Sequence, residues 1–342
     1  MKRIIPLCLA LIMTVGLLAG CGKQNEQTAS DKTRLRVVTT IFPEYDWVRE
    51  ILGDKADNAE VTMLLDNGVD LHSYQPTADD IVKISECDLF IYVGGESDDW
   101  VDDALKNAAN KNRKVINLLE ALGERVKTEE AVEGMQEEEH DHDHDHEDTD
   151  EHDDAKEHDN EEEAEYDEHV WLSLKNAQTL CSAISSVLQQ IDPDNKDTYA
   201  ANASAYIKKL SALDADYQAA VNAAACKTVL FGDRFPFRYL AEDYGLRYYA
   251  AFAGCSAESE ASFETVSFLA GKVDELNLPC VLTIEGVQHK IAETIVRNTA
   301  AKNQKVLTMD SMQSTTSKDA ANGTTYLSVM ERNLSVLKEA LG

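Results

Sequence analysis

The chain has 342 residues and a formal net charge of −31, of which −22 lies within residues 129–168. This acidity argues against nucleic-acid binding, which needs a basic face. Once the apolar N-terminus and the acidic segment are set aside, roughly 280 residues remain, enough for two domains with hydrophobic cores.

The N-terminus predicts an exported lipoprotein. Met1-Lys2-Arg3 precedes an apolar stretch over residues 4–18, which is too short for an ordinary membrane-spanning helix. We therefore expect a signal peptide over residues 1–20. The motif Leu-Ala-Gly-Cys at 18–21 resembles a bacterial lipobox, so we expect lipidation of Cys21, a membrane anchor through its acyl chains, and a polar linker over 21–33. The alternative is a plain secretory signal in which Cys21 is incidental.

Residues 34–194 predict an α/β lobe. Strands are expected at 35–41, 61–65, 89–93 and 114–118, because these runs are apolar and rich in β-branched residues. Helices are expected after Pro43, over 77–86, over 100–109 and over 173–190. The second of these opens with a capping box that begins at Thr77. Strands that alternate with helices imply a parallel sheet.

Residues 124–168 predict a disordered loop rich in His, Asp and Glu. Residues 129–168 contain 23 acidic residues and one Lys, so they cannot bury a core. Six of the nine histidines of the chain fall within 19 positions: His140, His142, His144, His146, His152 and His158. Imidazoles suit Zn, Ni or Cu, so the loop predicts accessory capture of a transition metal. The alternative is an inert acidic spacer.

An apolar stripe predicts one long helix over residues 195–225. Its members recur at spacings of seven, four, three, four and four: Tyr199, Tyr206, Leu210, Leu213, Tyr217 and Val221. Thirty residues in a helix span roughly 45 Å, enough to connect two lobes.

Residues 226–342 predict a second α/β lobe. Strands are expected at 228–231, 247–252, 281–284 and 306–309, and helices at 236–244, 263–276, 288–302 and 324–341. The predicted fold class is therefore α/β, with two parallel-sheet lobes joined by one long rigid helix and a metal site in the cleft between them.

The candidate metal ligands follow from the rule that ligands bind beyond the carboxyl ends of parallel strands. His72 and His169 lie in loops of the first lobe, and Asp233 and Asp310 follow strands of the second. Taken singly, a loop histidine is often a surface residue and such an aspartate often caps a helix. Glu285 could support the site or cap a helix.

Two imidazoles with one or two carboxylates suit Zn²⁺, whereas Mn²⁺ prefers more oxygen ligands. This set does not exclude Mn²⁺, but the histidine-rich loop favours Zn²⁺. Cysteines give less guidance, because no CxxC spacing is present and a cysteine-based zinc site is not expected. After the signal and the lipobox, five cysteines remain, so at least one is a free thiol: Cys87, Cys181, Cys226, Cys255 and Cys280.

These motifs together resemble the substrate-binding lipoproteins of the zinc/manganese family, which serve ATP-driven metal importers. Residues 71–76 (Leu-His-Ser-Tyr-Gln-Pro) are similar to the family's first-ligand motif, and residues 167–173 (Asp-Glu-His-Val-Trp-Leu-Ser) to its second. The long helix and Tyr244-Gly245-Leu246 fit as well, and the histidine-rich loop is typical of the zinc-selective branch. The resemblance implies a buried cleft site, little hinge motion, and an extracytoplasmic, lipid-anchored and non-enzymatic monomer that delivers metal to a membrane permease.

One position departs from the family pattern. The family has His or Glu as its third ligand, and counting back from Tyr244-Gly245 puts Arg234 there. Arginine has no acceptor lone pair and cannot bind a metal. We therefore expect either that Asp233 takes this place or that water completes the site, with Arg234 paired to a carboxylate.

Other functions remain open at this point. The chain could be a manganese- or iron-binding member of the same importer class, or a surface metal buffer or adhesin in which the loop is the whole function. A metallohydrolase would need a general base beside the metal, and the sequence has no HExxH motif.

Overall fold

The computed structural model describes residues 34–106, 108–136, 165–256, 260–286 and 289–342. Leu35–Gly342 forms one compact unit, separate from Met1–Arg34. The predicted signal peptide, Cys21 and linker, and the six loop histidines, lie outside the described residues. Among those described, no helix has both the length and the apolar character that crossing a bilayer requires.

The first lobe contains a four-stranded parallel sheet in the order β2-β1-β3-β4. Its strands are β1 (Leu35–Thr39), β2 (Ala59–Met63), β3 (Leu89–Tyr92) and β4 (Lys114–Asn117). All four lie within three residues of the predicted ends. All residues of β3 are buried, as expected for a strand covered on both faces.

The second lobe contains another four-stranded parallel sheet, in the order β6-β5-β7-β8. Its strands are β5 (Thr228–Arg234), β6 (Arg247–Phe252), β7 (Cys280–Thr283) and β8 (Lys305–Thr308). β5 pairs with β6 in regular register as far as Phe231, and the register then shifts before Arg234. The last residues of β5 therefore lie outside the regular hydrogen-bond ladder.

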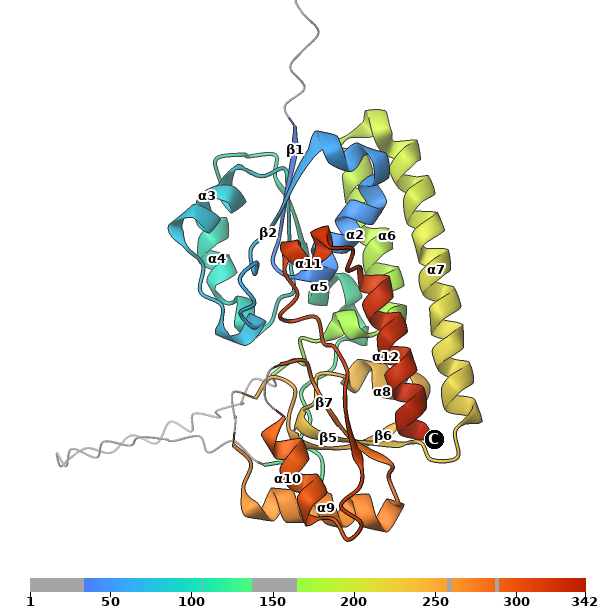
Figure 1. Cartoon of the computed structure of the whole chain (residues 1–342). Helices are drawn as coiled ribbons and strands as arrows, with labels where there is room; N and C mark the ends of the chain where they lie inside the picture. The colour runs from blue at the N-terminus through green and yellow to red at the C-terminus, as the bar shows by residue number, and fades with distance from the viewer. Residues whose placement is uncertain (1–33, 107, 137–164, 257–259, 287–288) are drawn as a thin grey trace, which may run out of the picture. The chain divides into compact units, whose positions relative to one another are not determined.

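Helices follow the strands in both lobes (Figure 1). In the first lobe they are α2 (Phe42–Leu52), α3 (Ala78–Glu86), α4 (Trp100–Leu105), α5 (Leu118–Leu122) and α6 (Leu174–Ile191). In the second they are α8 (Arg238–Tyr244), α9 (Phe263–Leu276), α10 (Lys290–Asn298), α11 (Ser317–Ala321) and α12 (Tyr326–Leu341). The capping box predicted at Thr77 is confirmed, since its side chain accepts from Asp80 N and Asp80 reaches back. The two five-residue helices, α5 and α11, were not predicted.

The long helix α7 (Lys196–Ala223) runs beside both lobes (Figure 1). All six residues of the predicted stripe are buried, and they pack with α2, α6 and α12. The stripe thus explains why a helix of 28 residues is stable: it buries one continuous face against the helices of both lobes.

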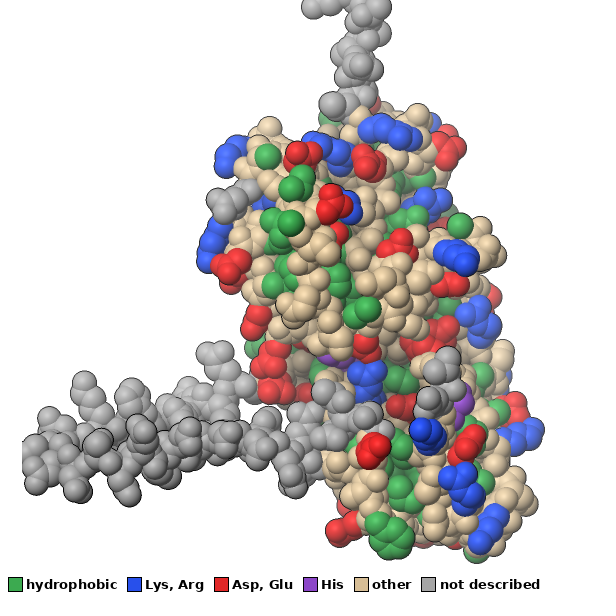
Figure 2. Space-filling model, turned by 60° about the vertical axis from the view of Figure 1, so that its left-hand side comes forward, with side chains coloured by type: hydrophobic (Ala, Val, Ile, Leu, Met, Phe, Trp, Pro, Cys, Tyr) green, Lys and Arg blue, Asp and Glu red, His purple; other side chains and the backbone are tan. Residues whose placement is uncertain are grey.

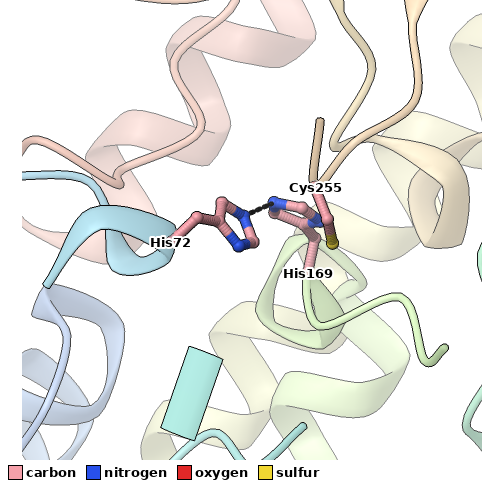
Figure 3. Close-up of side chains that lie close together, drawn as sticks. All are labelled: His72, His169 and Cys255. Atoms are coloured by element: carbon pink, nitrogen blue, oxygen red, sulfur yellow. Dashed lines mark hydrogen bonds between the residues drawn. The ribbon is translucent and has the colours of Figure 1, made fainter. Parts of the chain in front are cut away.

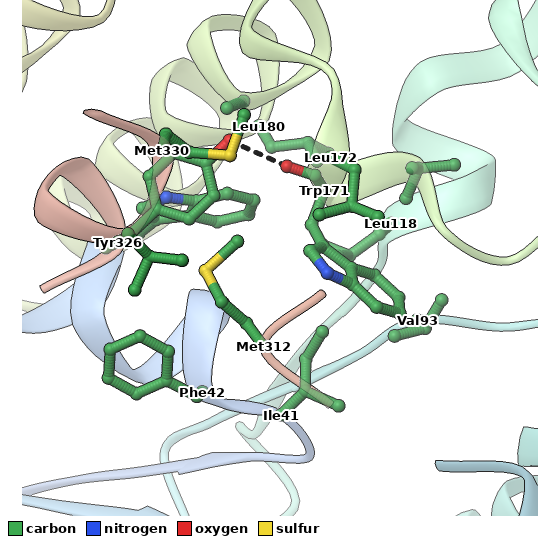
Figure 4. Close-up of a cluster of buried hydrophobic side chains, with 14 of the residues drawn as sticks. Ile41, Phe42, Val93, Leu118, Trp171, Leu172, Leu180, Met312, Tyr326 and Met330 are labelled. Carbon is green, nitrogen blue, oxygen red and sulfur yellow. Dashed lines mark hydrogen bonds between the residues drawn. The ribbon is translucent and has the colours of Figure 1, made fainter. Parts of the chain in front are cut away.

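The C-terminal segment packs back onto the first lobe, as Figure 4 shows for a cluster of buried side chains around Trp171 and Tyr326. Tyr326 Oη donates to the carbonyl oxygen of Trp171 at 2.7 Å, and Trp171 Nε1 donates to the carbonyl oxygen of Ser311 at 2.9 Å. The backbone N–H of Tyr326 also donates to Asp46, on α2. These buried bonds join the segment after β8 to the first lobe.

Both ends of the segment predicted as a disordered loop are ordered. Thr128 and Tyr166 form an antiparallel bridge, and the backbone N–H of Asp167 donates to the carbonyl oxygen of Lys127 at 2.9 Å. Further along, Gln136 N donates to Ala251 O, at the end of β6. The structure therefore differs from the prediction at residues 124–136 and 165–168, because their backbone groups pair with each other and with the second lobe.

The stripe on α7 can be tested by truncating one member. We expect Leu210→Ala, at a fully buried position, to lower the free energy of unfolding by about 2–5 kcal/mol, since it removes apolar contacts and leaves a cavity. Urea denaturation of both proteins measures this difference. Lys209→Ala, one residue away and exposed, is the control and should stay within about 0.5 kcal/mol of wild type. Equal effects from the two changes would contradict the assigned packing.

Candidate metal centre

His72 stands on a short 3₁₀ turn, η2 (Leu71–Ser73), in the loop after β2. Asp70 caps this turn, because its Oδ1 accepts the backbone N–H of His72 at 3.0 Å. On the ring, Nδ1 lies 2.8 Å from Ser97 Oγ and 3.5 Å from a Glu168 oxygen. These partners occupy one ring nitrogen of His72, and the other, Nε2, faces His169.

His169 lies directly before the turn η5 (Val170–Leu172) and is fully buried. Asp167 Oδ1 lies 3.0 Å from the backbone N of His169 and 2.9 Å from its Nδ1. We assign the ring proton to Nδ1 from this network, which leaves a lone pair on Nε2. A buried carboxylate that holds the distal nitrogen of an imidazole is the usual outer partner of a metal-binding histidine.

The two imidazoles point toward each other (Figure 3). Their Nε2 atoms are 3.3 Å apart. Burial, reinforced by the charge that His169 would carry, lowers the pKa of His72 to about 3. The His72 ring is therefore neutral at physiological pH, as a metal ligand must be.

A third possible ligand atom joins them from the second lobe. Cys255 lies in the loop after β6, and its Sγ and one nitrogen of each imidazole all lie within 4.8 Å of one another. Burial, with the negative charges of Glu129 and Asp167, raises the pKa of this thiol. Cys255 was not among the predicted ligands, although the strand-end rule applied to the predicted strand 247–252 points to it.

Arg234, at the position where the family has its third ligand, makes its side-chain hydrogen bonds to residues other than the two histidines. Arg234 Nη2 donates to Asp70 Oδ2 at 2.6 Å, an ion pair between the two lobes, as its chemistry predicts. Asp233 does not join the histidines: its Oδ2 accepts from Thr283 Oγ1 at 2.7 Å and from the backbone N–H of Ile284 at 3.3 Å. The structure therefore does not bring Asp233 to the site.

Asp310 is also turned away from the histidines. Its Oδ1 accepts the backbone N–H of Met312 at 2.9 Å, and its Oδ2 lies 3.4 Å from Arg332 Nη2. From the same loop, Gln313 does reach the site, with its Nε2 2.6 Å from His169 Nε2. Glu285 holds this loop, since it accepts from the backbone N–H groups of Ser311 and Gln313.

Acidic side chains border the cleft, and Figure 2 shows them gathered where the two lobes meet. A pocket of about 910 Å³ lies at the base of the His-rich segment. Its lining includes five carboxylates: Glu96, Asp99, Glu120, Glu124 and Glu165. Such a surface raises the local concentration of cations.

Two further carboxyl groups, those of Glu44 and Asp98, lie buried in the first lobe, as Glu168 does. Burial, with the charge of Asp98, raises the pKa of Glu44 to about 8, and burial raises that of Asp98 to about 7. Glu44 Oε2 accepts from the backbone N–H of Thr40 at 2.8 Å, whereas Glu44 Oε1 and Asp98 Oδ1 have no hydrogen-bond partner among the described residues. The folded chain therefore holds protons here that the unfolded chain would release.

The chain is similar to known zinc-binding proteins over almost its whole length. A model of the family described as zinc-uptake complex component A, periplasmic, matches residues 37–340. The zinc-binding lipoprotein AdcA of Streptococcus pneumoniae is 31% identical over 339 residues, which cover 99% of this chain but only 61% of AdcA. The high-affinity zinc uptake system protein ZnuA of Bacillus subtilis is 31% identical over 327 residues, covering 95% of this chain and 94% of ZnuA.

Among solved structures, the Zn(II)-bound ZnuA-like domain of S. pneumoniae AdcA is similar to this chain, with a TM-score of 0.66 at 29% identity. The match covers 90% of this chain and 99% of that domain. The part of AdcA that this chain matches is therefore a separate, zinc-binding unit of the longer protein.

The buried carboxyl groups predict how stability depends on pH. Because the folded-state pKa of Glu44 lies above its ordinary value, its contribution is fully present below pH 4.5 and is lost as pH rises through about 8. We expect the free energy of unfolding to fall between pH 5 and pH 9, and Glu44→Gln to flatten that fall. Urea denaturation across this range measures both slopes, with the exposed Glu60→Gln as control. An unchanged slope in Glu44→Gln would show that Glu44 does not hold the proton.

Proposed function

Because the chain belongs to the family of zinc-uptake complex component A, we propose that it captures Zn²⁺ outside the cytoplasm and delivers it to the membrane permease of an ABC-type importer. The cation is its cargo. We propose binding rather than catalysis, because the two histidines are arranged as ligands, with a carboxylate holding the far ring nitrogen of His169.

The observation that carries this proposal is the pair of opposed imidazole nitrogens, His72 Nε2 and His169 Nε2, 3.3 Å apart. Two nitrogens bound to one tetrahedral Zn²⁺ at its usual bond length would be about 3.3 Å apart. The pair therefore fits around a single ion with little change. In the structure the two Nε2 atoms share a hydrogen bond, and a cation bound between them would replace that bond with two ligand bonds.

Zn²⁺ is favoured over Mn²⁺ by the ligands at hand. The predicted carboxylates Asp233 and Asp310 are hydrogen-bonded elsewhere, so the site is richer in nitrogen and poorer in oxygen than the sequence analysis expected. Imidazole suits Zn²⁺, whereas Mn²⁺ prefers carboxylate, carbonyl and water.

The remaining parts of the chain fit the same role. We propose that acyl chains on Cys21 hold the protein, as a monomer, at the outer face of the cell membrane. The histidines of residues 140–158 would bind Zn²⁺ weakly and raise its concentration beside the cleft. The acidic pocket at the base of that segment would act in the same direction.

The tight site should depend on His72. In a competitive titration of residues 22–342 with Zn²⁺ and Mn²⁺, we expect one tight Zn²⁺ site, weakened at least about 10-fold in His72→Ala because a direct ligand is worth no less than an outer partner. His289→Ala is the matched control: this histidine contacts Thr283 and should leave the tight site intact.

The same titration separates transport from buffering. Several weak sites of equal affinity, unaffected by His72→Ala, would contradict a carrier and leave a surface metal buffer as the function.

The His-rich segment should affect the rate of loading rather than the affinity of the cleft. We expect deletion of residues 137–160 to slow Zn²⁺ uptake at low concentration while leaving the equilibrium affinity nearly unchanged. Stopped-flow competition with a zinc indicator measures the rate, and titration measures the affinity. A collapse of affinity in the deletion variant would mean that the segment itself is the primary site.

A further inference from the structure

We propose that the Cys255 thiolate is the third protein ligand of the cation, so that the cleft presents two imidazole nitrogens and one sulfur. This inference rests on the proposed function and identifies the donor that replaces the family's third ligand. It makes the site selective for zinc and softer cations, since thiolate ligands favour these and not Mn²⁺.

Geometry is the first argument. In a tetrahedral zinc site with usual bond lengths, a nitrogen and a sulfur ligand lie about 3.6 Å apart. The ligand atoms of His72, His169 and Cys255 all lie within 4.8 Å of one another, and no other group of three or more His, Cys, Asp or Glu among the described residues meets that condition. Figure 3 shows the cysteine beside His169, with the two rings facing each other. A small side-chain adjustment would bring the sulfur to bonding distance.

The backbone of the loop holds Cys255 at the site. Its N–H donates to Glu129 Oε1 at 2.8 Å, which ties it to the ordered end of the acidic segment. The preceding residue, Gly254, packs against His169: a Cβ there would lie 3.1 Å from ring atoms Cε1 and Nδ1. A larger residue would push the loop away, so glycine permits the close approach of the thiol.

Arg234 stands at the family's third-ligand position, so the site needs a donor from another residue, and the contacts of Arg234 hold its side chain aside. Its guanidinium is paired with Asp70 and also lies 3.4 Å from the carbonyl oxygen of Ser256, next to the cysteine. Arginine cannot bind a metal, and the ion pair with Asp70 both holds the guanidinium and offsets its positive charge. The side chain is therefore not free to approach a bound cation. As the metal–sulfur bond forms, the thiol proton is released to solvent.

Cobalt provides the direct test, because Zn²⁺ has no visible spectrum and Co²⁺ bound to a thiolate gives an intense near-ultraviolet charge-transfer band. We expect this band in the whole wild-type chain at one equivalent of Co²⁺. Cys255→Ser should lose it and should bind Zn²⁺ at least about 10-fold more weakly. Cys226→Ser is the matched control, since Cys226 is also a partly buried free thiol of the second lobe, and it should keep both properties.

Alkylation of the wild-type chain tests the same point without a mutation. We expect Zn²⁺ to block modification of Cys255 by N-ethylmaleimide, read by peptide mass spectrometry, and to leave Cys226 reactive. A tight Zn²⁺ site that needs His72 but shows no thiolate band and no protection of Cys255 would overturn this inference and leave the proposed function standing. Absence of any tight, His72-dependent site would instead overturn the proposed function.

Discussion

The candidate metal centre depends first on the hydrogen bond between Asp167 and His169 Nδ1. It fixes both the tautomer and the orientation of a fully buried ring, so the lone pair on Nε2 points into the cleft. Asp167 is itself almost fully buried, and a charge-assisted bond shielded from water is strong. The approach of His72 and the contact of Gln313 both use the nitrogen that this bond leaves free.

The fold could be predicted from the sequence because its helices and strands have clear patterns of apolar residues. The stripe on α7 extends over six turns, and the strands of both lobes are short apolar runs between turn residues. Element ends were less predictable. Helix α10 was expected over 288–302 but covers only Lys290–Asn298, since Thr299 has an extended backbone (φ −70°, ψ 161°) that ends the helix. Helices α5 and α11 have five residues each, too few to produce a recognisable period.

The site was only partly predictable, for a physical reason. His72 and His169 follow from their loop positions and motifs, but a carboxylate after a strand has many possible partners. Asp233 accepts from the Thr283 hydroxyl and Asp310 from the backbone N–H of Met312, and neither is among the groups that gather with the histidines. Cys255 was overlooked because paired cysteine spacing is a signal of sites built from one segment. Here the donors come from separate segments in two lobes, and only the folded chain brings them together.

The contacts between the lobes differ in the free energy needed to break them. The bonds of Tyr326 to Trp171 and to Asp46 are fully buried, so breaking each would leave an unpaired polar group at a cost of about 1–3 kcal/mol. The ion pair of Asp70 and Arg234 is partly exposed, and pairs of that kind contribute about 1 kcal/mol or less. Local displacement of the segment around Asp70 would therefore cost less free energy than separation of the whole lobes. This ion pair joins the end of β5 to the segment that precedes His72, so displacement of that segment away from the second lobe breaks it.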